Sequence, residues 1–234
     1  MHRLTITLLI ILGLTIAACS DDEGPGGSGN PCASDFDQQA LFQNLADNLI
    51  VPLFQNLQLD LNQLQTAVKS FTQDPDQTQL SIARSLWESA YLTYQRTGIY
   101  EFGPAETVFL RSSLNNFPVD TAQIEENVST GIYDFSSFDS FDKGFPAMDY
   151  LLFGLGESDA DIIAAYSTGD RAAAYGQYLQ DMVADMKERV DLIVAEWVGG
   201  GYREEFIANT GTAAGTSLSL IVNNLNQYYE AIKR

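Results

Sequence analysis

The stretch LFQNLADNLIVPLFQNLQLDLNQLQTAVKSF (Leu41–Phe71) decides the fold class of this chain. Apolar residues recur in it at steps of three and four, which places them on one face of a helix. They are Leu41, Leu45, Leu49, Leu53, Leu57, Leu61, Leu64, Val68 and Phe71. Pro52 lacks the amide proton that an internal helical turn needs, so we predict a kink there. The pattern predicts one long, kinked, amphipathic helix.

Helical patterns also fill most of the chain after this stretch. Asp74-Pro75-Asp76-Gln77 predicts a second helix with Asp74 as its N-cap and Pro75 at its first position. Its inward residues are expected to be Leu80, Ala83, Trp87, Ala90, Tyr91 and Tyr94. Further helices are predicted over residues 105–114, from Asp120 to Gly131 with Asp120 as the N-cap, from Pro146 to Gly154, over residues 170–198, and through Leu218, Ile221, Leu225, Tyr228 and Ile232.

No segment of useful length alternates apolar and polar residues as a strand would. Residues 132–143 have no helical stripe, and we interpret them as an ordered loop that tucks its phenylalanines under neighbouring helices. In the helix over 170–198 we expect one buried stripe. It consists of Tyr175, Tyr178, Met182, Met186, Val190, Ile193 and Trp197. The fold class is therefore all-α, with up-and-down packing of helices.

The N-terminus is predicted to be an export signal rather than part of the fold. Residues 1–18 combine a short charged start with an apolar run that is too short for a transmembrane helix. Ile16-Ala17-Ala18-Cys19 resembles the lipobox of bacterial lipoproteins, in which the cysteine is lipidated; the alternative is an ordinary cleaved signal that leaves Cys19 as a free thiol. Residues 19–35 are polar and glycine-rich, as in a flexible tether, and residues 36–234 form the helical domain.

Lipidation of Cys19 would anchor the protein to a membrane of the cell envelope. Ser20 follows the cysteine, where an aspartate would resemble an inner-membrane retention signal, so we expect the outer membrane and leave its periplasmic or surface face open. The net charge of −19 repels nucleic acid, which excludes that partner. Cations, cationic proteins of the envelope and neutral ligands stay as candidates.

The histidine count excludes several kinds of catalysis. The single histidine, His2, lies in the export signal, so the domain can build neither a Ser-His-Asp triad nor a histidine-type zinc site. Carboxylates and 11 tyrosines leave oxygen chemistry, and carboxylate oxygens suit hard cations such as calcium, magnesium or manganese. The acids Asp134, Asp139 and Asp142 precede Asp149 closely, and either a solvated loop or a cation site fits them.

The order of several segments resembles imelysin-like proteins, also described as imelysin peptidases. The segments are LADNLIVPLFQNL, RSLWESAYLTYQRTGIYEFGP, LNNFPVD and GFPAMDYLLFG, and together they span nearly all of the domain. The resemblance implies two bundle-like helical halves with a site between them, an envelope location and an association with iron uptake. The last helix pattern runs to Arg234 without a capping residue, which allows the second half to be incomplete.

The family motif GxHxxE falls on Gly144, Pro146 and Asp149, where proline replaces the histidine and aspartate the glutamate. Pro146 has no side-chain donor or acceptor, so it can neither bind a metal nor transfer a proton. The ring of Pro146 suits the first turn of a helix. The alternative to a ligand role for Asp149 is structural: its carboxylate would interact favourably with the helix N-terminus. The loop acids and the resemblance together give two sets of residues. The ligand or metal candidates are Asp149, Asp120, Tyr94 and Asp142, and the turn positions are Gly103 and Pro104.

Three functions are consistent with these observations. The first is a non-catalytic envelope lipoprotein that binds a ligand or a metal, iron or calcium, in the service of iron uptake. The second is a metal-dependent peptidase whose metal is held by carboxylates and tyrosines. The third is a structural or adhesive surface module, for which exposed phenylalanines in residues 135–145 would be the sign.

Overall fold

The structure, a computed structural model, describes residues 36–137 and 140–233. Cys19 and the rest of the predicted signal and tether lie outside these residues. The described residues form helices and no strand, which confirms the all-α class. The α-helices are α1 (Gln38–Leu45), α2 (Val51–Gln73), α3 (Gln77–Thr97), α4 (Pro104–Thr107), α5 (Leu110–Leu114), α6 (Thr121–Thr130), α7 (Gly144–Asp149), α8 (Asp159–Ser167), α9 (Ala172–Val198), α10 (Tyr202–Ala208) and α11 (Ser217–Ile232). Two π-helical turns, η1 (Ala46–Ile50) and η3 (Tyr150–Gly154), and one 3₁₀ turn, η2 (Gly98–Tyr100), complete the order.

The predicted first helix is interrupted by η1 immediately before Pro52. The amide of Val51 donates to the carbonyl of Ala46, five residues back, which widens the turn. Proline cannot donate to the carbonyl four residues back and its ring crowds that carbonyl, so a widened turn relieves the conflict. The break moves the buried stripe. Before the proline, the buried residues are Phe42, Ala46 and Ile50, whereas the predicted Leu49 is 42% exposed.

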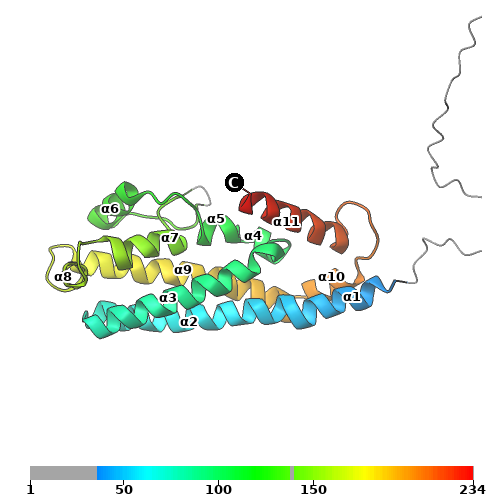
Figure 1. Cartoon of the computed structure of the whole chain (residues 1–234), viewed down its shortest axis with the longest axis horizontal. Coiled ribbons are helices and arrows are strands. Elements are labelled where there is room, and N and C mark those ends of the chain that lie inside the picture. The colour runs from blue at the N-terminus through cyan, green and yellow to red at the C-terminus, as the bar shows by residue number, and fades with distance from the viewer. Residues whose placement is uncertain (1–35, 138–139, 234) are drawn as a thin grey trace, which may run out of the picture. The chain divides into compact units, whose positions relative to one another are not determined.

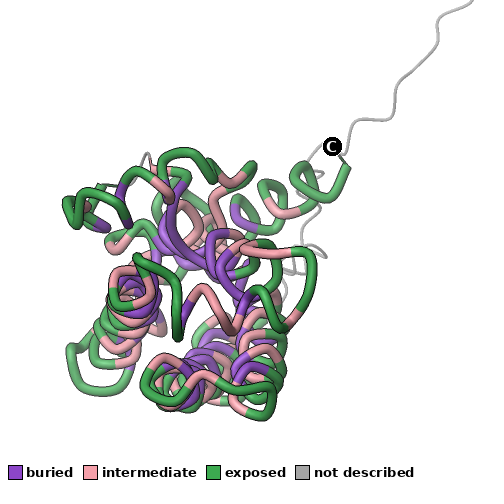
Figure 2. The backbone as a smooth tube through the Cα atoms, turned by 90° about the vertical axis from the view of Figure 1, so that its left-hand side faces the viewer, coloured by how far each residue is buried: buried purple, intermediate pink, exposed green. Residues whose placement is uncertain are grey.

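Beyond Pro52 the predicted stripe is confirmed from Leu57 to Phe71. Helix α2 packs along both α3 and α9, and the short connection of residues 74–76 makes α2 and α3 antiparallel (Figure 1). The buried parts of the chain face the inside of this bundle and the exposed parts face outward (Figure 2). Burial of apolar surface along these three long helices is the main source of stability.

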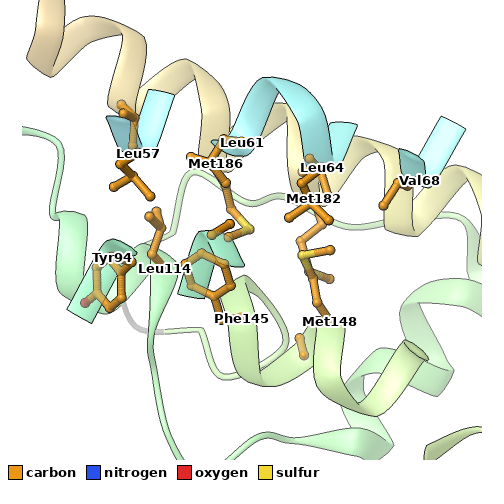
Figure 3. Close-up of a cluster of buried hydrophobic side chains, with 14 of the residues drawn as sticks. Leu57, Leu61, Leu64, Val68, Tyr94, Leu114, Phe145, Met148, Met182 and Met186 are labelled. Carbon is orange, nitrogen blue, oxygen red and sulfur yellow. The ribbon is translucent and has the colours of Figure 1, made fainter. Parts of the chain in front are cut away.

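The centre of the core lies where α2, α7 and α9 meet (Figure 3). The labelled side chains there are all buried: Leu57, Leu61, Leu64, Val68, Tyr94, Leu114, Phe145, Met148, Met182 and Met186. The stripe predicted for residues 170–198 is also confirmed, since every member from Tyr175 to Trp197 is buried. Three of these buried side chains are methionines, whose unbranched chains adapt to irregular gaps in a core.

Two predicted helix boundaries are corrected. Helix α3 has Asp76 as its N-cap, whose carboxylate accepts from the amide of Gln79 at 2.7 Å, whereas Asp74 ends α2. The predicted helix over residues 105–114 is two short helices, α4 and α5, separated at Phe109, which adopts a left-handed conformation with φ 53°. Local sequence did not reveal this reversal, because a phenylalanine rarely adopts positive φ.

Residues 132–143 form no helix where they are described, as expected for a loop. Phe135 is buried, Phe141 is 38% exposed, and Phe138 lies outside the described residues. The side chain of Lys143 is almost fully buried and donates to the carbonyls of Phe135, at 2.6 Å, and Ser137. This buried ammonium, which the sequence did not predict, fixes the loop against the bundle.

Helices α8 and α10 were not predicted, and α11 packs differently from its prediction. Leu225 and Ile232, expected to face inward, are 52% and 68% exposed, whereas Asn224 is buried. Helix α11 lies against η2, with the ring of Tyr228 next to Gly98. Among the helices of the described residues, none is both long and apolar enough to cross a bilayer.

Candidate functional site

The motif segment begins at Gly144, where the backbone takes φ +77° and lies against α5. A Cβ atom there would lie 2.4 Å from the carbonyl oxygen of Leu114, so only glycine fits. The next carbonyl, of Phe145, accepts a hydrogen bond from Trp87 Nε1 at 3.1 Å, which joins α7 to α3. Pro146 sits in the first turn of α7, as its fixed φ favours. The segment is thus firmly held by packing.

Asp149 is the last residue of α7, not part of its first turn. The expected interaction with the helix N-terminus is therefore not formed, because that end lies at Gly144. The carboxylate is exposed and has no hydrogen-bond or ion-pair partner among the described residues. Partial desolvation raises the pKa of Asp149 above its ordinary value, and no cation nearby offsets it. Nothing in its surroundings requires a carboxylate for stability.

Asp120 and Asp142 lie close together but perform separate tasks. Asp120 is the N-cap of α6, as predicted, and accepts from the amide of Gln123 at 3.0 Å; its own amide donates to Phe141 O at 2.8 Å. Asp142 is only 6% exposed. Its Oδ2 accepts from Asn127 of α6, and its carbonyl accepts from the Tyr178 hydroxyl of α9 at 2.7 Å. Asp142 thus ties the loop to two helices.

The loop acids do not gather around one point. Asp134 accepts from the amide and hydroxyl of Ser136, both at 2.8 Å, in a local turn. Asp142 lies beside the buried Lys143, and Asp139 is outside the described residues. Burial and the nearby Arg189 lower the pKa of Lys143. Within residues 36–137 and 140–233, no group of three or more His, Cys, Asp or Glu side chains could hold a metal ion.

Tyr94 belongs to the core, and its hydroxyl donates to Glu101 Oε1 at 3.3 Å. Glu101 is also paired with Arg111. Burial raises the pKa of the Tyr94 phenol well above its ordinary value. The ring of Tyr94 packs 5.5 Å from that of Phe145, beside the motif segment. Its role in packing is therefore clear, and its hydroxyl is already engaged.

Gly103 and Pro104 border a hollow of about 400 Å³ at the outer face of α9. Its other lining residues are Thr107, Val108, Leu192, Glu196 and Tyr202. Gly103 has φ +57°, and a Cβ atom there would overlap the ring of Tyr202 at 2.1 Å. The glycine therefore permits close packing of α4 against α10. The hollow is mostly apolar and lies apart from the motif segment in sequence.

Glu125 of α6 is the centre of a polar cluster that the sequence did not predict. Its Oε1 accepts from the hydroxyl of Tyr150 at 2.8 Å and from that of Tyr175 at 2.9 Å. Its Oε2 accepts from Tyr175 at 2.7 Å and is paired with Arg171 Nη1 at 2.8 Å. The Arg171 guanidinium also lies 5.0 Å from the centre of the Tyr175 ring. We call these four side chains the Glu125 cluster.

The electrostatics of the Glu125 cluster favour an ionised carboxylate. Desolvation acts to raise the pKa of Glu125, but the hydrogen bonds from Tyr175, Tyr150 and Arg171 outweigh it and lower the pKa. Burial, followed by the hydrogen bond to Glu125, raises the pKa of Tyr150 to about 12. The same two causes raise the pKa of Tyr175. The cluster is half-exposed, since 31% of the Glu125 side chain and 44% of that of Arg171 are accessible.

Three distant segments assemble the cluster. Glu125 is on α6, Tyr150 opens the π-helical turn η3 directly after Asp149, and Tyr175 is in the first turns of α9. A Cβ atom on Gly154 would lie 2.9 Å from the Tyr150 ring, so the absence of a side chain at Gly154 leaves the space that the ring occupies. Tyr175 belongs to the predicted buried stripe and is buried, but its hydroxyl also donates to Glu125, which the stripe did not indicate. No pattern in the sequence predicted the cluster, because the π-helical turn that places Tyr150 appears only in the structure.

Comparison with known proteins agrees with this architecture. The family model of imelysin (Peptidase_M75) matches residues 50–234, so the chain belongs to the imelysin family. It is 23% identical over 155 residues to "Iron-regulated protein A" of Synechococcus elongatus, a match that covers 66% of this chain. Among solved structures, it is similar to one described as an iron-regulated protein A precursor from Parabacteroides distasonis, with a TM-score of 0.63, 21% identity and 81% of this chain covered.

These relatives are longer than this chain. The match spans 39% of the Synechococcus protein and 54% of the Parabacteroides chain. The structural similarity, at this identity, concerns the fold. The family assignment confirms the resemblance found in the sequence, including the position of GFPAMDYLLFG within the matched residues.

Proposed function

We propose that this protein is a non-catalytic, lipid-anchored protein of the cell envelope that binds iron, or a ligand that carries it. The observation that carries the non-catalytic part is the state of the motif segment. Pro146 stands where the family motif has histidine, and the Asp149 carboxylate has no partner among the described residues. With proline in the histidine position, the Asp149 carboxylate alone cannot form a centre that activates water.

Peptidase chemistry would need such a centre. Zinc sites that activate water hold the metal through imidazole, carboxylate or thiolate ligands that converge on one ion. The only histidine of the chain is His2, in the predicted signal, and among the described residues no three His, Cys, Asp or Glu side chains converge. The proposal therefore assigns binding rather than hydrolysis to the domain.

The iron-related part of the proposal is supported by the relatives and by the chemistry of the chain. Both relatives are named as iron-regulated proteins. A strongly negative domain that offers carboxylate and phenol oxygens suits a hard cation. The lipobox-like segment before Cys19 supports attachment to an envelope membrane, and the outer membrane is part of the proposal.

A titration of the purified full chain tests the proposal. We expect ferric citrate to raise the midpoint of thermal unfolding, and we expect no cleavage of casein with or without added zinc. Calcium and haem serve as competing candidates. If neither ferric citrate nor haem changes the midpoint, the iron-related function is wrong, whatever calcium does. If casein is cleaved, the cleavage is blocked by a chelator, and Asp149→Ala abolishes it, the protein is a peptidase.

The adhesive alternative loses the feature that would favour it. Of the described phenylalanines in residues 135–145, Phe135 and Phe145 are buried and Phe141 is partly exposed. They therefore form no broad aromatic surface on this loop.

A further inference from the structure

The Glu125 cluster brings two phenol hydroxyls to one carboxylate, so all of its candidate ligand atoms are oxygens. Both phenol hydroxyls lie within 2.9 Å of the same carboxylate oxygen, Glu125 Oε1. We propose that Glu125, Tyr150 and Tyr175 bind a trivalent hard cation, ferric ion, and that Arg171 holds a small oxyanion that accompanies it. This inference rests on the proposed function and names the place where iron would bind.

The spacing of the oxygens fits coordination to one ion. Small hard cations bind oxygen ligands at about 2.0 Å in octahedral geometry, which sets neighbouring ligand oxygens about 2.8 Å apart. The hydrogen bonds between the phenol oxygens and the Glu125 carboxylate measure 2.7 to 2.9 Å. A cation that replaces the two phenol protons can therefore bind with small movements of the three side chains.

The charge of the donors selects a trivalent ion. Two phenolates and one carboxylate carry three negative charges, which match a +3 ion, while the two displaced phenol protons leave to solvent. No electron is transferred in this exchange. The ligand set contains neither nitrogen nor sulfur, so it disfavours softer metals such as copper and zinc. Calcium, which binds carboxylates, carbonyls and water, gains little from phenols.

Arg171 has the position and freedom needed to hold an anion. Its side chain is 44% exposed, and it lies at the N-cap position of α9, before the first turn that carries Tyr175. Three protein oxygens leave half of an octahedron open. A carboxylate or carbonate that fills those positions can form paired hydrogen bonds with the guanidinium. Arg171 would then move from Glu125 to the anion, so its charge supports the cation complex instead of opposing it.

The donors are held in place before any ion arrives. The Tyr175 ring is buried, 6.0 Å from the ring of Tyr166, whose hydroxyl donates to Leu151 O at 3.1 Å. The Tyr150 ring lies over Gly154 within the π-helical turn. Rings fixed by packing lose little freedom on binding, which favours affinity.

The test uses the purified full chain titrated with ferric citrate, because phenolate bound to ferric ion gives a visible charge-transfer band. We expect such a band with the unaltered protein, and also binding of gallium(III) in preference to calcium. Tyr150→Phe and Tyr175→Phe should each weaken ferric binding at least about tenfold and reduce the band, and the double variant should abolish it. Arg171→Gln should weaken binding of ferric citrate, by about tenfold.

Tyr133→Phe is the matched control. The Tyr133 hydroxyl donates at 2.8 Å to the carboxylate of Asp181, which does not belong to the Glu125 cluster. This variant should leave the band and the affinity for ferric ion unchanged. Circular dichroism checks that each variant is folded. If a phenylalanine variant does not fold, Glu125→Gln tests the same site and should likewise weaken ferric binding. Ferric binding without a visible band, or a band that Tyr133→Phe reduces as much as the others, would overturn this site while leaving the proposed function standing. Absence of all iron binding would overturn both.

Discussion

Arg203 of α10 binds Asp47 of the π-helical turn η1 through two parallel hydrogen bonds, from Nε to Oδ1 at 2.6 Å and from Nη2 to Oδ2 at 2.7 Å. The two residues are 156 positions apart. The pair closes one end of the bundle, where α1 also packs against α10. The hydrogen bond from Arg203, which outweighs the desolvation that opposes it, holds the pKa of Asp47 below its ordinary value.

Replacement of Arg203 by lysine should lower the free energy of unfolding modestly, by about 0.5 kcal/mol, because lysine cannot form the paired geometry and the two side chains are partly solvated. Because the pKa of Asp47 is lowered in the folded state, the contribution of the Asp47–Arg203 pair to the free energy of unfolding is fully present above the ordinary carboxyl pKa of about 3.9. It is lost as the pH falls through the lowered value. Urea titrations at neutral and acid pH measure both effects. Arg96→Lys, at an exposed arginine that forms no ion pair with the described residues, is the control and should leave stability unchanged. An equal loss in both variants would contradict this account.

Gly144→Ala and Gly131→Ala should differ strongly, although both glycines have positive φ, +77° and +66°. At Gly131 nothing lies within 4 Å of the added Cβ, so only the left-handed conformation costs energy, about 1 kcal/mol. At Gly144 the same atom meets the carbonyl of Leu114 at 2.4 Å. We expect a loss there of at least about 3 kcal/mol, measured by thermal unfolding. Similar losses at both sites would show that the α5–α7 contact is loose.

Leu61→Ala should destabilise the domain by about 3 kcal/mol, because Leu61 is fully buried where α2, α7 and α9 meet (Figure 3). Leu59→Ala, two residues earlier in the same helix and 54% exposed, should change stability by less than about 0.5 kcal/mol. Chemical denaturation of the two variants gives the comparison directly. A large effect at Leu59 would mean that this face of α2 is covered in solution.

Asp120→Ala and Asp149→Ala distinguish a structural carboxylate from one that the fold does not use. Asp120 caps α6, so its loss should lower the free energy of unfolding by about 1 kcal/mol. Asp149 has no hydrogen-bond or ion-pair partner in the described part of the chain, and desolvation raises its pKa, which means that its charged form opposes folding above the ordinary carboxyl pKa. Asp149→Ala should therefore leave stability unchanged or raise it slightly at neutral pH. A clear loss at Asp149 would reveal a stabilising contact.

The long buried stripes could be predicted from sequence, because helical periodicity depends on residues within two turns of each other. The stripe from Leu57 to Phe71 and the one from Tyr175 to Trp197 are both confirmed. The cap at Asp120 was equally accessible, since a cap is decided within four residues. The prediction failed at Leu49, where the π turn before Pro52 shifted the buried face, and at Leu225, where packing against η2 turned the apolar face outward.

The candidate site shows the same division between local and distant interactions. The sequence alone determined that the domain has no histidine and that proline occupies the histidine position of the motif, because composition and order need no coordinates. It could not show that Glu125, Tyr150 and Tyr175 share one hydrogen-bonded centre, because these residues are up to 50 positions apart. Only the tertiary arrangement of α6, η3 and α9 decided that, since hydrogen bonds form between groups that folding brings within about 3 Å, whatever their separation along the chain.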